Sequence, residues 1–253
     1  MIALVTGASS GIGREIALKL AEKGIRLVIS GRNEEKLEEL RDEIGANRVK
    51  IIVADISKKS ECVRLYKEAS KYNVSILVNN AGFGLFGNFC SSDLDRELEM
   101  VDVNIKAVHT LMKLFLADFA ERDKGYILNV ASSAGFMAGP LMATYYATKN
   151  YVVKLTQAVR EEMRVKGSKV YIGAFCPGPV MTPFNDVAGV DFGLRGITAE
   201  YAAECAVNGM LARKSLIIPT AKMKFLVYGS RIIPDNLLAA VTYKIQTQKG
   251  EVK

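Results

Sequence analysis

Short apolar runs alternate with amphipathic stretches from residue 1 to about residue 80. Continuous runs of this kind are typical of strands buried on both faces, whereas apolar positions three or four residues apart predict helices. We expect strands at Ile2–Val5, Leu27–Ile29, Val49–Val53 and Ile76–Val78. We expect helices at Gly11–Lys23, Glu34–Ile44 and Lys58–Lys71. This alternation predicts an α/β fold in which helices flank both faces of a doubly wound parallel β-sheet.

The alternation continues more loosely through the rest of the chain. We expect one or two helices in Asp93–Arg122, a strand at Tyr126–Val130, a long helix at Thr144–Lys166 and a strand at Lys169–Phe175. Gly, Pro and Asn punctuate residues 177–196, and a helix at Ala199–Ala212, a strand near Leu216–Ile218 and a helix from about Ile233 follow. Because no linker, repeat or low-complexity tract interrupts the pattern, we expect one domain over residues 1–253. Within it, about 183–214 is expected to be a substrate loop or lid, and about 222–253 a basic, apolar C-terminal extension.

Charge and cysteine content narrow the class of protein. The 253 residues include 34 Lys and Arg against 27 Asp and Glu, but the cations are scattered, so we expect no nucleic-acid partner. The four cysteines lie far apart without a CxxC pair, which predicts no zinc site and favours a reducing, cytoplasmic location. We expect neither a signal peptide nor a transmembrane segment, since the most apolar late stretch is interrupted by charges and a proline. The single histidine, His109, is expected to be packed or interfacial, and no metal is expected.

A glycine-rich turn follows the first predicted strand and opens the first predicted helix, with the sequence Thr6-Gly7-Ala8-Ser9-Ser10-Gly11-Ile12-Gly13. Glycines allow a tight turn and a close approach of the backbone to a pyrophosphate, and the helix N-terminus supplies N–H donors. Glycines that only satisfy backbone dihedral angles would give the same pattern. The position of the turn between strand and helix favours nucleotide binding.

Further motifs follow the turn in order along the chain. Asn79-Asn80-Ala81-Gly82 comes after the fourth predicted strand, Asn104 lies in the next helix, and Ser132 follows the fifth strand. Tyr145 and Lys149 form a YxxxK motif, and Pro177-Gly178-Pro179-Val180-Met181-Thr182 follows the sixth strand. With the TGxxxGxG spacing of the turn, these motifs resemble the classical short-chain dehydrogenase/reductase family over about residues 1–220. The resemblance implies a Rossmann fold, an oxidoreductase acting on a small carbonyl or alcohol with a nicotinamide cofactor, and a homodimer or homotetramer.

The Tyr145–Lys149 pair carries acid–base chemistry in this interpretation. Residues four apart lie on one face of a helix, and a nearby ammonium lowers the pKa of a phenol from about 10 toward neutrality. An ordinary helix tyrosine beside a solvated lysine is the alternative for the pair alone. The resemblance implies that Ser132 orients the substrate oxygen, with Ser133 as the alternative, and that Asn104 holds a water that connects Lys149 to solvent. Tyr146 has no lysine four residues later and is expected to pack or to line the substrate pocket.

The end of the second predicted strand indicates the choice of cofactor. It carries no acidic residue for the ribose hydroxyls of NAD and offers Arg32, which suits a 2′-phosphate, so we expect NADP in preference to NAD. Ser10 stands where some NADP-using members have a basic residue. Asp55 is expected to bond the adenine or else to cap the helix that begins near Ser57. The expected cofactor contacts are Thr6, Gly7, Ser9, Ser10, Gly11, Ile12, Gly13, Arg32, Asn33, Asp55, Ile56, Asn80, Ala81, Gly82, Tyr145, Lys149, Pro177, Gly178, Val180 and Thr182.

The residues expected around the substrate are apolar, which suits a hydrophobic carbonyl or alcohol better than a sugar or a charged keto acid. They are Phe83, Leu85, Phe86, Phe136, Met137, Met142, Phe184, Val187 and Phe192. The C-terminal region, with Pro219 and Pro234, resembles a subgroup of long-chain 3-oxoacyl and steroid ketone reductases, which implies a 3-oxoacyl or steroid-like substrate.

The motifs therefore predict an NADP(H)-dependent oxidoreductase, such as a carbonyl reductase, that transfers hydride between the nicotinamide and a carbonyl or alcohol substrate, with Asn104, Ser132, Tyr145 and Lys149 as catalytic residues. An NAD-linked alcohol or sugar dehydrogenase and a non-catalytic dinucleotide sensor are the alternatives.

Overall fold

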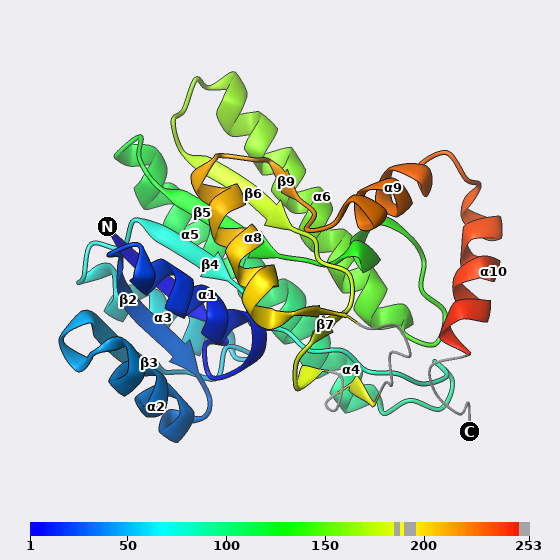
Figure 1. The fold of residues 1–253 in the computed structure, drawn as a ribbon, viewed down its shortest axis with the longest axis horizontal. Coiled ribbons are helices and arrows are strands. Elements are labelled where there is room, and N and C mark those ends of the chain that lie inside the picture. Colours follow the sequence, from blue (N-terminus) through cyan, green and yellow to red (C-terminus); the bar gives the residue numbers. More distant parts are fainter. Residues whose placement is uncertain (185–187, 190–195, 248–253) are drawn as a thin grey trace.

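A seven-stranded parallel sheet forms the centre of the computed structural model, which describes residues 1–184, 188–189 and 196–247. Its strand order is β3-β2-β1-β4-β5-β6-β9, and every neighbouring pair is parallel (Figure 1). The strands are β1 (Ile2–Thr6), β2 (Arg26–Gly31), β3 (Val49–Val53), β4 (Ile76–Asn79), β5 (Tyr126–Val130), β6 (Tyr171–Phe175) and β9 (Leu216–Ile217). A separate parallel pair joins β7 (Val180–Met181) to β8 (Ile197–Thr198).

Helices cover both faces of the sheet, as the alternating pattern predicts. On one face lie α1 (Gly11–Glu22), α2 (Glu34–Ile44) and α8 (Ala199–Leu211), and Figure 1 shows α1 and α8 beside one another. On the other face lie α3 (Lys59–Ser70), α5 (Val108–Glu121) and α6 (Ala143–Val165). The doubly wound Rossmann fold predicted from the sequence is therefore confirmed.

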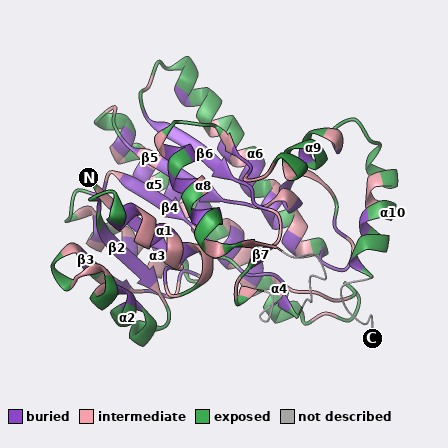
Figure 2. Ribbon diagram, in the orientation of Figure 1, coloured by how far each residue is buried: buried purple, intermediate pink, exposed green. Residues whose placement is uncertain are grey.

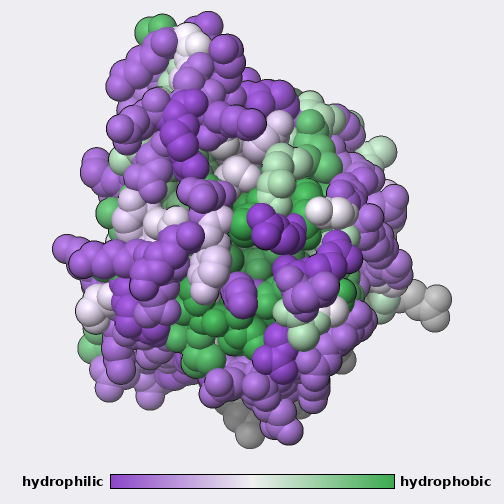
Figure 3. Space-filling model, turned by 90° about the vertical axis from the view of Figure 1, so that its left-hand side faces the viewer, coloured by the Kyte–Doolittle hydropathy of each residue, from purple (hydrophilic) through white to green (hydrophobic). Residues whose placement is uncertain are grey.

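Burial follows these layers. The strands are buried while the outward sides of the helices are exposed (Figure 2). On the face in Figure 3, hydrophilic side chains cover most of the surface, and apolar side chains are exposed in an area between them. Within residues 1–184, 188–189 and 196–247, no helix has the length and apolar character needed to cross a membrane.

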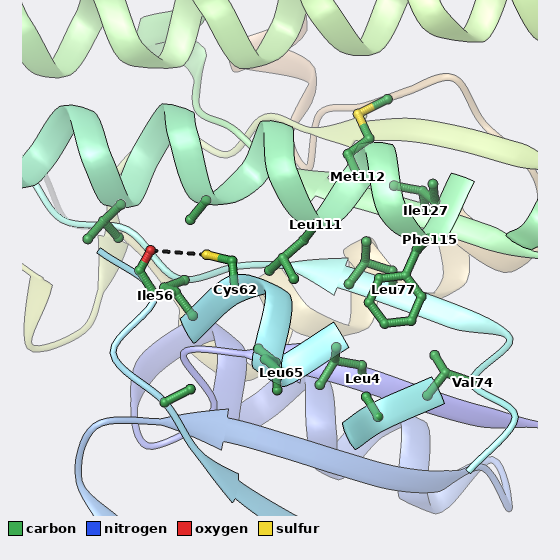
Figure 4. Close-up of a cluster of buried hydrophobic side chains, with 14 of the residues drawn as sticks. Leu4, Ile56, Cys62, Leu65, Val74, Leu77, Leu111, Met112, Phe115 and Ile127 are labelled. Carbon is green, nitrogen blue, oxygen red and sulfur yellow. Dashed lines mark hydrogen bonds between the residues drawn. The ribbon is translucent and has the colours of Figure 1, made fainter. Parts of the chain in front are cut away.

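Successive strand residues enter opposite halves of the core. Leu4 of β1 packs in a cluster with Leu65 and Phe115, and the next residue, Val5, packs on the other face with Leu20. Figure 4 shows the first cluster, in which the Cys62 thiol also donates to the backbone oxygen of Ile56 at 3.3 Å. Because side chains of a strand alternate between faces, continuous apolar strands are needed to fill both halves.

The predicted helical stretch Asp93–Arg122 consists of three segments. Helix α4 (Leu94–Val101) passes into a π-helical turn, η2 (Asp102–Ala107), and this turn passes into α5. Asn104 lies in the π-helical turn with 1% of its surface exposed. A π-helical turn holds an extra residue per turn and often occurs at functional sites. The sequence pattern did not distinguish it from an α-helix.

The C-terminal region contains a helix that the sequence analysis missed. Thr220 is the N-cap residue of helix α9 (Ala221–Gly229), and its side chain accepts a hydrogen bond from the Met223 backbone N–H at 3.2 Å. Helix α10 (Asp235–Gln246) then begins after Pro234, two residues later than expected from Ile233. Lysines at positions 222 and 224 interrupt the apolar periodicity that would indicate this helix. The signal that could have predicted it is Thr220, because threonine is a favoured N-cap residue.

Short helical turns complete the described chain. The 3₁₀ turn η1 (Ala46–Arg48) precedes β3, and the 3₁₀ turn η3 (Ser133–Phe136) follows β5. The side chain of Ser132 caps η3 by accepting a hydrogen bond from the Ala134 backbone N–H at 3.1 Å. The backbone after β5 therefore turns at the residue that the sequence analysis singled out.

Candidate active site

A cavity of about 730 Å³ lies at the carboxyl ends of the central strands. Thr6 ends β1, Gly31 ends β2, and Asn80 and Ser132 follow β4 and β5 closely; all four line the cavity. The strand order places β2 and β4 on opposite sides of β1. Ligands of open α/β sheets bind where the strand order changes direction in this way, outside the carboxyl ends.

The glycine-rich turn packs tightly beneath one end of this cavity. Gly7 and Gly11 have φ of +66° and +55°, in the left-handed region that favours glycine. A Cβ on Gly7 would lie 2.8 Å from Cα of Ala81, and the Asn80 side chain donates to the Thr6 backbone oxygen at 3.0 Å. The turn is thus held against the segment after β4 in a form that side chains would prevent.

The N-terminus of α1 opens into the cavity with its N–H donors available. Ser10 is the N-cap residue but makes no side-chain capping bond, and the first turn of α1 contains no acidic residue. Helix α2 differs, because Asn33 accepts from the Lys36 backbone N–H at 2.9 Å and acidic residues occupy its first turn. Together with the glycine turn, the uncapped α1 N-terminus fits an anionic group such as a pyrophosphate.

The cavity brings together nearly all the site residues predicted from the sequence. It is lined by the predicted Thr6, Gly7, Ser9, Ser10, Gly11, Ile12, Arg32, Asn33, Asp55, Ile56, Asn80, Ala81, Gly82, Ser132, Tyr145, Lys149, Pro177, Gly178, Val180 and Thr182. Two predicted residues, Gly13 and Asn104, do not line it. A Cβ on Gly13 would overlap the Asn80 side chain and the Gly7 backbone oxygen, so this glycine packs the turn against α1.

Tyr145, Ser132 and Lys149 meet at the middle of the cavity. Tyr145 and Lys149 lie one turn apart near the start of α6, with 9% and 5% of their surfaces exposed. The Lys149 ammonium lies 5.8 Å from the centre of the Tyr145 ring and donates to the backbone oxygen of Val130 at 3.1 Å. A phenol, a hydroxyl and an ammonium therefore face one space, as the sequence predicts.

Burial is the main cause of the pKa shift of the Tyr145 phenol. Burial raises the pKa of Tyr145 above its usual range, and the Ser132 hydroxyl opposes this only in part. The predicted lowering of the Tyr145 pKa is therefore wrong for the ligand-free chain. Burial also lowers the pKa of Lys149 to about 8, because the charged form loses hydration. Tyrosine with its ordinary pKa of about 10 is protonated at neutral pH, and the raised pKa keeps Tyr145 in this form.

Asn104 does not line the cavity but holds neighbouring segments of the site together by hydrogen bonds. Its amide donates to the backbone oxygen of Phe83 at 2.9 Å and to Thr148 at 3.1 Å, and its side-chain oxygen accepts from the Phe83 N–H at 3.1 Å. A Cβ on Gly82 would lie 2.9 Å from that oxygen and 3.3 Å from the Lys149 nitrogen. Asn104 therefore fixes the segment after β4 against α6, and the absence of a side chain at Gly82 leaves room between Asn104 and Lys149.

Charged groups lie at the far end of the cavity, beyond β2 and β3. Arg32 pairs with Glu99 at 3.0 Å, with 66% of the Arg32 side chain exposed. Burial acts to raise the pKa of Asp55, but hydrogen bonds from Ser57 and the charges of Arg32 and Lys58 outweigh it and lower this pKa. Asp55 accepts a hydrogen bond from the Ser57 hydroxyl at 2.8 Å. Lys58 is the N-cap residue of α3, and no side chain makes a capping bond there. The capping alternative for Asp55 is therefore wrong.

The apolar side of the cavity differs in part from the prediction. Phe83, Met137, Met142 and Phe184 line it, whereas Leu85, Phe86 and Phe136 do not. These three pack against the core clusters instead. Val187 and Phe192 lie outside the described residues. The sequence analysis missed the lining residues from α9 and α10, among them Met223, Leu226, Leu238, Val241, Thr242 and Ile245. The spacing of the last four was a usable helical signal.

The predictions for Tyr146 and His109 had different outcomes. Tyr146 lines the cavity as expected, and its hydroxyl accepts a hydrogen bond from Gln246 of α10 at 2.8 Å. His109 was expected to be packed or interfacial, but it is exposed in the chain, and its ring lies 2.7 Å from the Tyr151 hydroxyl. The prediction of a packed side chain is wrong because this position faces outward from α5, and the alternative of a subunit interface stays a prediction.

Comparison with known proteins agrees with this geometry. The sequence profile described as short chain dehydrogenase matches residues 1–190. The chain belongs to this family of oxidoreductases. An uncharacterized oxidoreductase of Staphylococcus epidermidis is 35% identical over 212 residues, which cover 83% of this chain and 90% of the relative.

The fold of this chain superposes on solved structures of short-chain dehydrogenases along nearly its whole length. A short-chain dehydrogenase from Sphingobium yanoikuyae in complex with NADPH superposes with a TM-score of 0.82 at 27% identity, covering 91% of this chain and 93% of that one. A short-chain dehydrogenase/reductase from Burkholderia phymatum in complex with NAD has a TM-score of 0.82 at 26% identity, covering 90% and 91%. The family resemblance found in the sequence is therefore confirmed.

Proposed function

We propose that this short-chain dehydrogenase reduces a hydrophobic carbonyl compound with NADPH. The observation that carries the proposal is one cavity with three parts: an anion-binding turn, the Ser132–Tyr145–Lys149 group, and an apolar region. The two similar structures contain NADPH in one case and NAD in the other, which supports a nicotinamide dinucleotide here.

The cofactor preference rests on the residues after β2. Residues 30–33 read Ser-Gly-Arg-Asn, without a carboxylate to accept hydrogen bonds from the ribose hydroxyls of NAD. Arg32 lines the cavity and presents a guanidinium suited to the 2′-phosphate of NADP. Gly7, Gly11 and the α1 N-terminus would hold the pyrophosphate, and Pro177, Gly178, Val180 and Thr182 would hold the nicotinamide end.

The protein's own residues would manage the proton and the substrate oxygen. The bound cofactor supplies the hydride for the carbonyl carbon. Tyr145, a protonated phenol at neutral pH, donates its phenolic proton to the substrate oxygen, and Ser132 donates a hydrogen bond that orients this oxygen. Lys149 stabilises the phenolate left on Tyr145, since its ammonium lies 5.8 Å from the ring centre. Asn104 positions the segment after β4 and, we propose, holds the water that returns a proton.

The substrate proposal follows from the lining of the open end. Phe83, Met142 and Phe184 line the cavity together with apolar residues of α9 and α10. Such a surface favours a hydrophobic ketone or a 3-oxoacyl or steroid-like compound over a sugar. The predicted substrate loop at about 183–214 is too long, because Ala199–Leu211 forms α8, which packs on the sheet beside α1. Phe184 of this segment lines the cavity, and the C-terminal extension would form part of the pocket wall. The homodimer or homotetramer and the cytoplasmic location stay predictions.

The test is consumption of NADPH or NADH with ketones that range from small diketones to aromatic, long-chain and steroid ketones. NADPH consumption is expected to exceed NADH consumption and to fall about 10²- to 10⁴-fold in Tyr145→Phe, the usual contribution of a general acid. Tyr151→Phe, an exposed tyrosine on the same helix, is the matched control.

The alternatives give different results in this assay. Preference for NADH would favour an NAD-linked alcohol or sugar dehydrogenase, and the Arg32–Glu99 pair is the observation that keeps this candidate open. Cofactor binding without turnover of any ketone or alcohol, unaffected by Tyr145→Phe, would favour a non-catalytic sensor.

A further inference from the structure

The two C-terminal helices expose large apolar side chains around the open end of the cavity. Phe225, Leu226, Ile233, Val241 and Ile245 line the cavity and are also exposed, with 80% of Phe225 in contact with solvent. Ile232 and Leu237 extend this area, with 86% and 57% exposed. We call these seven residues the C-terminal apolar surface. Apolar side chains gathered in this way mark a binding surface more often than isolated exposed residues do.

Helix α10 is attached to the rest of the chain along one narrow stripe. The buried or half-buried positions of α10 are Leu238, Ala239, Thr242 and Gln246, which form its inner side. Leu237, Val241 and Ile245, spaced four residues apart, lie on the adjacent exposed side. Figure 1 shows α10 at one edge of the molecule, next to α9. The helix therefore has an apolar side that the described chain leaves open to solvent.

Positive charge surrounds this surface. Residues 221–247 contain four cations, Lys222, Lys224, Arg231 and Lys244, and one carboxylate, Asp235. All four cations are exposed, and none forms an ion pair with a carboxylate in the described part of the chain. Cations beside exposed apolar side chains match the two layers of an anionic bilayer surface, the headgroups and the upper part of the acyl chains.

We propose that the C-terminal apolar surface docks on the surface of an anionic lipid bilayer. Helices α9 and α10 are too short to span a bilayer, so they would lie in its interface with the apolar side chains inserted between headgroups. Five of the inserted residues also line the cavity, so its open end would face the acyl chains. An apolar substrate would then enter from the lipid without crossing water, a consequence that rests on the proposed function.

A second copy of the chain fits this surface less well. In a two-fold symmetric pair the same patch meets itself, so two surfaces that each carry four cations and one carboxylate would be brought together. Like charges brought together in a partly dehydrated contact oppose association. Anionic headgroups would neutralise the same cations, and this complementarity decides between the two partners.

The test is co-sedimentation of the full chain with vesicles of phosphatidylcholine alone or mixed with phosphatidylglycerol. Binding is expected to the mixed vesicles, to weaken with added salt, and to be lower on phosphatidylcholine alone. Lys222→Gln with Lys224→Gln is expected to weaken binding to the mixed vesicles about 25-fold, roughly fivefold for each lysine. Ile232→Ser with Leu237→Ser, at exposed positions that do not line the cavity, should weaken binding to both kinds of vesicle.

Matched controls lie at the opposite end of α6, far from the cavity. Val165, 72% exposed, and Lys166 end that helix, and Val165→Ser with Lys166→Gln should leave vesicle binding unchanged. Circular dichroism verifies that each variant is folded. Equal binding to both vesicle types, no binding, or equal loss in the control variant would overturn the proposal. So would a concentration-dependent dimer that Ile232→Ser with Leu237→Ser dissociates in sedimentation velocity. Vesicle binding requires no turnover, so it is judged separately from the reductase activity.

Discussion

Replacing Arg32 tests the cofactor assignment through a single side chain. Arg32 lies where β2 ends, lines the cavity, and in the ligand-free chain pairs with Glu99 at 3.0 Å. Glu99 also pairs with Arg96 of the same helix. A 2′-phosphate would therefore compete with the Glu99 carboxylate for the Arg32 guanidinium. Arg32→Ala is expected to weaken use of NADPH and to leave use of NADH nearly unchanged.

The size of this effect follows from the exposure of the two groups. A hydrogen bond to a charged group contributes about 1.5–3 kcal/mol, and a solvent-exposed ion pair about 0–1 kcal/mol. The phosphate contact forms at the expense of the Glu99 pair, so the net loss in Arg32→Ala is about 1–2 kcal/mol, roughly 5- to 30-fold in kcat/KM for NADPH. Glu99→Gln should do the opposite and raise kcat/KM for NADPH up to about fivefold.

The assay measures kcat/KM for both cofactors with one ketone at low salt, in wild type, Arg32→Ala, Glu99→Gln and the double variant. Arg41→Ala is the matched control, because Arg41 forms exposed pairs with Glu38 and Asp42 on α2 and does not line the cavity. Glu99→Gln should have no benefit when Arg32 is already absent.

Equal losses for NADPH and NADH in Arg32→Ala would refute this reasoning, since the guanidinium would then contact a part that both cofactors share. A gain from Glu99→Gln that persists in the double variant would also contradict it, because the carboxylate would then act on the cofactor directly.

Three further predictions concern stability. Gly13→Ala should lower the free energy of unfolding by roughly 1–3 kcal/mol, because its Cβ would overlap the Asn80 side chain, and thermal melting measures this loss. Phe115→Ala should cost roughly 3–5 kcal/mol in denaturant unfolding, since Phe115 is 1% exposed, whereas Phe225→Ala, 80% exposed, should change stability by under about 0.5 kcal/mol. Burial raises the pKa of the Cys62 thiol to about 11 in the folded chain, so the unfolded chain loses the thiol proton at a lower pH than the folded chain does. Stability should therefore fall as pH rises from about 9 to 11, by up to about 1.4 kcal/mol per pH unit for this thiol, and less steeply in Cys62→Ala. An unchanged pH slope in that variant would contradict the assignment.

The sequence predicts the sheet well because its strands are buried on both faces. The predicted strands Val49–Val53 and Tyr126–Val130 match the observed β3 and β5 to the residue. Short, mainly apolar runs rich in β-branched and aromatic residues favour buried strands. The site residues were equally accessible, because parallel strands place their carboxyl ends together whatever the details of the helices. Ser132 lines the cavity for this reason, whereas Tyr145 and Lys149 reach it from the first turns of α6.

Other features depend on contacts that local pattern does not contain. The pairing of Arg32 with Glu99 joins residues from α4 and the end of β2, and nothing in either segment indicates it. The pKa of Tyr145 depends on how completely the surrounding elements bury it, so spacing from Lys149 alone gave the wrong direction. Leu85 and Phe136 looked like pocket residues because they follow catalytic motifs, but packing turned them toward the core.

The π-helical turn between α4 and α5 makes chain length a constraint at the site. Met100 before the turn and Leu111 after it are both fully buried, and Asn104 within it reaches the backbone of Phe83. Each residue of an α-helix advances the side-chain direction by about 100°. The π-helical turn already takes up one residue more than an α-helical turn, so deleting one residue within Asp102–Ala107 would convert it to α-helix with the apolar sides of α4 and α5 still in phase. The same deletion would move Asn104 away from the backbone of Phe83. Inserting a further residue would instead rotate α5 against α4 by about 100° and expose one apolar side.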